Sequence, residues 1–161
     1  MASRRKSKGS GWGGARPGAG RKPGPNPKPR HVKREGFRPQ TPIHVQLKPV
    51  EGLPTLRTRR VFSELEEALE ASDDRFGFYI DRYAATKDTL HLLVRAGRRN
   101  SLFRGMQGLS IRIARGLNRA WDRDGQVFDT RYRADVLDTP EKVRAAMKQF
   151  PSGSPWSGVL E

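Results

Sequence analysis

The sequence has 161 residues, no cysteine and a formal charge of +15, from 32 Lys and Arg against 17 Asp and Glu. The absence of cysteine excludes disulfides, a thiolate nucleophile and zinc sites that need Cys ligands. No apolar run approaches the roughly 18 residues of a membrane span, and no signal-peptide pattern is present. We therefore expect a cytoplasmic chain without a membrane partner, whose basic excess favours polyanions such as nucleic acid.

The positive charge is concentrated near the N-terminus. Residues 1–39 hold 12 Lys and Arg and one acid, for +11, while the other 122 residues hold 20 and 16, for +4. The same segment holds 8 Gly and 6 Pro, so it has little apolar area to offset the entropy of ordering. We predict a disordered basic arm over 1–39, a folded domain over 40–150 and an irregular tail over 151–161.

The arm contains a Gly-Arg-Lys-Pro stretch at 20–23 that resembles the core of an AT-hook. In such a motif an extended backbone lets cations enter the narrow minor groove, here Arg16, Arg21 and Lys22. Lys22 stands where the motif has glycine, and a polycationic tail that contacts phosphates without preference is the alternative. Either interpretation predicts binding that weakens steeply with salt, because each neutralised phosphate releases counterions.

Alternation of apolar and polar residues predicts the strands. Residues 41–48 alternate in this way and predict a half-buried strand. Two further strands are expected at 76–83 and 89–95, joined by a polar turn. A fourth strand is expected within 125–137, and it carries Arg131, Tyr132 and Arg133.

Apolar residues at helical spacing predict three helices. Residues 59–71 form an acidic helix, which we expect to face water away from nucleic acid. A long helix follows, capped by Asn100 or Ser101 and ending near Trp121, with glycines that would let a neighbour approach closely. The last helix, to about position 149, begins with Thr139 as its N-cap and Pro140 at its first position. This order of elements predicts an α+β fold, an antiparallel sheet with packed helices.

The long predicted helix carries four arginines on one face. They have no glutamate between them on that line, so they gain no ion pairs within the helix. A solvated charged face and a phosphate-binding face are both compatible with this pattern. With two arginines of the next strand, the candidates for nucleic-acid binding in the folded domain are Arg104, Arg112, Arg115, Arg119, Arg131 and Arg133.

Several motifs together resemble the REP-associated tyrosine transposases, which belong to the single-tyrosine HUH transposases. They include Leu-His-Leu-Leu-Val at 90–94, Gly-Met-Gln-Gly at 105–108 and Val-Phe-x-x-Arg-Tyr at 127–132, within a match from about 40 to 148. The resemblance implies a ferredoxin-like core that cuts single-stranded or hairpin DNA through a phosphotyrosine, with Mg²⁺ or Mn²⁺. It also implies a nucleoid-associated protein that is a monomer or a homodimer.

The metal-binding motif of this family departs from its pattern here. Family members use two histidines that flank one hydrophobic residue on a strand, and the matching positions are Thr89 and His91. These two are the candidate metal ligands, although a hydroxyl replaces imidazole poorly. His44 and His31 have no spacing that suggests completing the pair, and a structural role for His91 is the alternative.

The nucleophile of the family is missing at its expected place. The helix after the Arg-Tyr strand contains no tyrosine, and Gln149 or Phe150 lies near the expected position. Tyr132 is the candidate for a relocated nucleophile. We expect a DNA-binding protein that has lost cleavage, with an active metal-dependent transposase as the alternative. RNA binding and a decayed mobile-element product also remain open.

Overall fold

The computed structural model describes residues 36–128 and 131–160, and every structural statement below refers to these residues. Positions 1–35 of the arm predicted over 1–39 lie outside the described residues. The three candidate DNA-binding residues of the arm, Arg16, Arg21 and Lys22, are among these positions. The folded unit begins within the last residues assigned to the arm.

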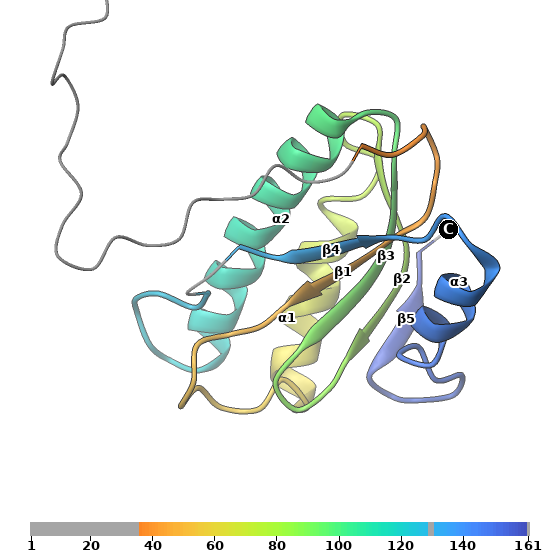
Figure 1. The fold of residues 1–161 in the computed structure, drawn as a ribbon. Helices are drawn as coiled ribbons and strands as arrows, with labels where there is room; N and C mark the ends of the chain where they lie inside the picture. Colours follow the sequence, from red (N-terminus) through yellow and green to blue (C-terminus); the bar gives the residue numbers. More distant parts are fainter. Residues whose placement is uncertain (1–35, 129–130, 161) are drawn as a thin grey trace, which may run out of the picture. The chain divides into compact units, whose positions relative to one another are not determined.

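One antiparallel sheet of five strands organises the described chain, in the order β4-β1-β3-β2-β5 (Figure 1). Since β1 lies between β3 and β4, the sheet joins segments that are far apart in the sequence. With three helices this is the α+β, ferredoxin-like fold that the sequence predicts. The strands are β1 (Ile43–Leu47), β2 (Phe78–Ala85), β3 (Leu90–Ala96), β4 (Arg133–Val136) and β5 (Ser157–Val159).

Three helices complete the fold: α1 (Arg59–Glu70), α2 (Arg99–Ala120) and α3 (Pro140–Met147). The helices α1 and α2 lie side by side on one face of the sheet, and α3 lies apart from both (Figure 1). None of the helices in the described part of the chain combines the length and apolarity needed to cross a bilayer.

The helix caps agree with the sequence in part. The Thr139 hydroxyl accepts the N–H of Lys142 at 3.3 Å and Pro140 begins α3, as predicted. The cap predicted for α2 is wrong, because this helix begins at Arg99 after Arg98, which makes no side-chain capping bond. The predicted caps, Asn100 and Ser101, therefore lie inside the first turn of α2.

The core lies between the sheet and the α1–α2 pair, and Gly105 of α2 lets the layers approach closely. The ring of Phe78 lies directly over Gly105, where an added Cβ would come within 2.6 Å of the Phe78 Cδ1 atom. Gly116 similarly faces Glu64 of α1. The close approach expected at the helical glycines is confirmed at these two positions. The most deeply buried large side chains include Ile43, Leu47, Leu65, Phe78, Leu92, Met106 and Ile113.

The C-terminal tail differs from the irregular segment expected over 151–161. Its strand β5 pairs with β2, and Trp156 meets Phe62 of α1 edge to face at a centroid distance of 5.5 Å. A three-residue edge strand is too short for alternation to reveal it, so its partner in the sheet decides its conformation. The strand expected within 125–137 is also shorter, and β4 is confined to its last part.

Candidate functional site

The face of the sheet opposite α1 and α2 carries two histidines from neighbouring strands. Side chains alternate along a strand, so the burial of Ile43 and Val45 in the core places His44 on the other face. The same alternation places His91 on that face of β3, between the core residues Leu90 and Leu92. Both histidine side chains nevertheless lie buried.

The two rings form a direct pair. His44 Nε2 lies 3.1 Å from His91 Nδ1, and the ring planes are nearly parallel, at 14° with centroids 5.3 Å apart. In the register of β1 against β3, His44 faces Leu93 and Gln46 faces His91, so the histidines are diagonal neighbours. One nitrogen donates and the other accepts, which requires at least one neutral ring.

Phe150, in the segment after α3, packs against one member of this pair, His44. Its ring meets that of His44 nearly edge to face, at 71° and a centroid distance of 5.8 Å. The Phe150 side chain is buried, whereas Gln149 is exposed. Of the two residues expected near the nucleophile position, Phe150 is therefore the one that contacts His44.

The surroundings hold both imidazoles neutral. Burial lowers the pKa of His44, and the nearby Asp135 offsets part of that effect. Burial first, and second the repulsion that a protonated His44 would exert, lower the pKa of His91 to about 4. At neutral pH the pair is thus an uncharged, hydrogen-bonded unit inside the protein.

The residues around this pair do not fit Mg²⁺ or Mn²⁺. A metal ion would need free imidazole nitrogens and room for bound water, whereas the facing nitrogens of this pair are joined to each other and both rings are buried. Within residues 36–128 and 131–160, no group of three His, Cys, Asp or Glu side chains is arranged to hold a metal ion.

Thr89, the other candidate ligand, belongs to a turn. Its hydroxyl bonds the Asp88 carboxylate at 3.2 Å, and its N–H bonds the Thr86 hydroxyl at 3.1 Å. Strand β3 begins one residue later, at Leu90. The pair that the structure forms is therefore His44 with His91, which the sequence spacing did not suggest.

Tyr132 lies on the other side of the sheet from the histidine pair. Its ring packs against the core on the side of the sheet that carries α1 and α2, as Ala134 does. Because side chains alternate along a strand, Arg133, which lies between them, is on the same face of the sheet as the histidines. This placement does not support Tyr132 as a nucleophile that acts with His91.

The other two tyrosines are engaged with carboxylates. Burial and a hydrogen bond of 2.9 Å to Glu66 raise the pKa of Tyr83 to about 12. A hydrogen bond to Asp74 raises the pKa of Tyr79. Both hydroxyls stay protonated at neutral pH, which makes them weak nucleophiles.

Two of the four arginines of α2 have partners on α1 or in the turn that follows it. Arg119 forms an ion pair with Glu64 of α1, and Arg112 donates to the Ser72 hydroxyl at 3.3 Å. The expectation that the acidic face of α1 turns only to water is thus wrong at Glu64. The missing intrahelical partner of Arg119 is supplied by the neighbouring helix.

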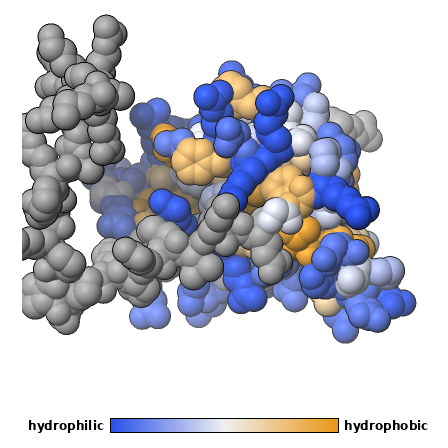
Figure 2. Space-filling model, turned by 45° about the horizontal axis from the view of Figure 1, so that its top comes forward, coloured by the Kyte–Doolittle hydropathy of each residue, from blue (hydrophilic) through white to orange (hydrophobic). Residues whose placement is uncertain are grey.

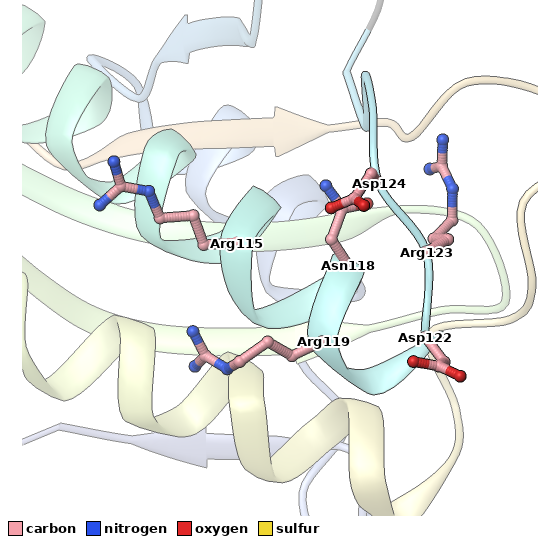
Figure 3. A pocket seen from close by; sticks show the side chains of 6 residues that line it. All are labelled: Arg115, Asn118, Arg119, Asp122, Arg123 and Asp124. Carbon is pink, nitrogen blue, oxygen red and sulfur yellow. The ribbon is translucent and has the colours of Figure 1, made fainter.

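Within the described residues, the other four candidate arginines form no ion pair or hydrogen bond with α1. Arg104 and Arg115 are exposed on α2, and Arg131 and Arg133 are exposed at β4, where Arg133 pairs with Asp135 at 3.1 Å. Figure 3 shows Arg119 reaching toward α1 while Arg115 points away from it. These side chains border an open hollow at the C-terminal end of α2, lined by Arg115, Asn118, Arg119, Asp122, Arg123 and Asp124.

Comparisons with known proteins identify the fold. No protein-family model and no curated protein matches the sequence. A REP-associated tyrosine transposase bound to a REP hairpin has a similar structure, with a TM-score of 0.58 and 12% identity over 79% of this chain and 81% of that one. A Deinococcus radiodurans protein named as a transposase gives a TM-score of 0.53 and 19% identity, over 74% and 94% of the two chains. The chain therefore has the fold of these transposases.

Proposed function

We propose that this chain is a DNA-binding protein on a transposase fold that no longer cleaves its substrate. The observation that carries the loss of cleavage is the buried histidine pair, in which His44 and His91 bond each other and Phe150 packs against His44. The fold shared with a transposase that binds a hairpin supports DNA as the ligand. The charge of +15 supports a polyanionic ligand independently.

Loss of cleavage follows from the chemistry of the side chains present. A phenylalanine has no oxygen with which to attack phosphorus, and Phe150 is the residue that the α3 segment brings to the histidines. All three tyrosines lie elsewhere, and Tyr79 and Tyr83 are bound to carboxylates. The buried pair also leaves little room for water or phosphate to reach the imidazoles.

Binding would rest on arginines that contact phosphate. Such contacts position a nucleic acid without reading its sequence, and they give affinities that fall with salt. Arg119 would first have to exchange its ion pair with Glu64 of α1, and Arg112 its hydrogen bond to Ser72. The candidates are Arg104, Arg115, Arg131 and Arg133 in the folded unit, with Arg112 and Arg119 after such an exchange, and Arg16, Arg21 and Lys22 in the arm.

The test combines binding with cleavage on one labelled hairpin oligonucleotide. We expect affinity that falls steeply from 50 to 200 mM salt, and no nicked product with Mn²⁺ or Mg²⁺. Affinity that barely changes with salt would refute the binding mode. The same hairpin made of RNA tests whether the ligand is DNA, and tighter binding of the RNA form would refute that assignment.

A further inference from the structure

An aromatic side chain is exposed at the tip of a tight turn before β2. The N–H of Phe78 bonds the carbonyl of Arg75 at 3.0 Å, and the two residues between them both have positive φ, +59° at Phe76 and +69° at Gly77. Two such residues in succession are typical of a type I′ turn, where Asn-Gly is preferred. Phe76 is therefore strained in its backbone.

Packing does not explain this residue either. The Phe76 side chain is 65% exposed, more than the exposed Phe103 of α2 at 52%. A residue that gains nothing from burial and strains the backbone points to a contact outside the described chain.

The acidic residues near this turn are engaged by internal partners. Asp73 accepts the N–H of Ile80 at 2.6 Å, and Asp74 is hydrogen-bonded to the Tyr79 hydroxyl. Asp81 is held by the guanidinium of Arg95 on β3. Their negative charges are thus partly balanced within the fold.

The arginines at the same end have no such partners. The N–H of Gly97 bonds the carbonyl of Gly77 at 3.0 Å, which brings the loop after β3 beside the Phe76 turn. Arg75 precedes the aromatic residue, and Arg98 and Arg99 follow Gly97. None of these three arginines forms an ion pair with another residue in the described ranges. Figure 2, in which this end comes forward, shows hydrophobic side chains lying among strongly hydrophilic ones.

We infer that the Phe76 ring stacks on an unpaired nucleotide of bound DNA, while Arg75, Arg98 and Arg99 contact the flanking phosphates. Every base offers a π-face to an aromatic ring, and a cationic surround attracts the backbone that carries it. The inference rests on the proposed DNA binding and names the part of the ligand that this end would take, a single-stranded extension beside the duplex.

The test compares a blunt hairpin with the same hairpin carrying a single-stranded extension. Phe76→Asn suits the positive φ and keeps the turn while removing the ring. We expect the variant to melt no lower than the wild type and to bind the extended hairpin roughly tenfold more weakly. Its affinity for the blunt hairpin should be unchanged. Phe76→Tyr should keep wild-type affinity for both, and Phe103→Ala is the matched control at another exposed Phe.

A fluorescent adenine analogue in the extension gives a second readout. We expect its emission to be quenched by the wild type and by Phe76→Tyr, and not by Phe76→Asn. If the wild type binds both hairpins but Phe76→Asn matches it on the extended one, the stacking inference fails and the proposed DNA binding stands. If the wild type binds neither hairpin, the proposed function itself fails.

Discussion

At the scale of single residues, His91 is the most perturbed group in the histidine pair. Its imidazole is buried against His44, with a pKa of about 4 against an ordinary value of 6.5. Well above pH 6.5 neither the folded nor the unfolded chain protonates this ring appreciably. Between pH 6.5 and 4 the unfolded chain takes up a proton that the folded chain does not, so stability is lost as the pH falls.

We therefore predict that the free energy of unfolding falls by about 2 kcal/mol when the pH is lowered from 7 to 5, because His91 stays neutral in the folded chain. Denaturant unfolding at several pH values measures this loss. His91→Gln keeps a polar group beside His44 without titrating, so its stability should fall less over the same range. Parallel curves for the wild type and the variant would contradict the burial of a neutral His91.

Among the elements, α2 contains two glycines, Gly105 and Gly108, that differ in how closely other side chains surround them. Gly105 faces the ring of Phe78, whereas a Cβ at Gly108 would meet only the end of the flexible Arg112 side chain, at 3.0 Å. One helix thus offers the same substitution at a crowded position and at an open one.

Gly105→Ala should destabilise the fold by roughly 1–3 kcal/mol, because the new methyl group displaces Phe78 and overpacks the core. Gly108→Ala should be neutral or stabilising by up to about 1 kcal/mol, because alanine favours helix. Chemical denaturation of both variants measures the difference. Equal effects at the two positions would show that the contact with Phe78 is not what requires glycine at 105.

The positions of single strands and helices could be predicted from the sequence, whereas contacts between them could not. Alternation in β1 and helical spacing in α1 predicted both within two residues, because each has one face in the core. The His44–His91 pair could not be predicted, since it depends on the register between two strands that have 42 residues between them in the sequence. The ion pair of Arg119 was missed for the same reason, because Glu64 comes from another helix. The sequence shows that no tyrosine lies near Phe150, but it could not predict that Phe150 contacts His44.

At the scale of the whole molecule, charge is divided between the N-terminal segment and the folded unit. Positions 1–39 carry +11 and the rest carries +4. If the arm contributes phosphate contacts, its removal should weaken binding to every sequence alike and change the response to salt.

We predict that the triple variant Arg16→Ala, Arg21→Ala and Lys22→Ala lowers the slope of log affinity against log salt concentration by up to about 3. Binding of one hairpin across a salt series measures this slope. Replacing Lys48, Arg59 and Arg123 removes the same charge from the folded unit and serves as the control. A triple arm variant with an unchanged slope would exclude these residues from phosphate contact.

The central claim is that this molecule holds DNA without joining to it. The direct measurement is to incubate the wild type with labelled hairpin DNA and Mn²⁺, denature the mixture and look for label that migrates with the protein. Tyr132→Phe is run beside it. The account predicts a complex before denaturation and no covalent adduct after it in either sample. An adduct in the wild type that disappears in Tyr132→Phe would contradict it, because a tyrosine would then still attack the phosphodiester.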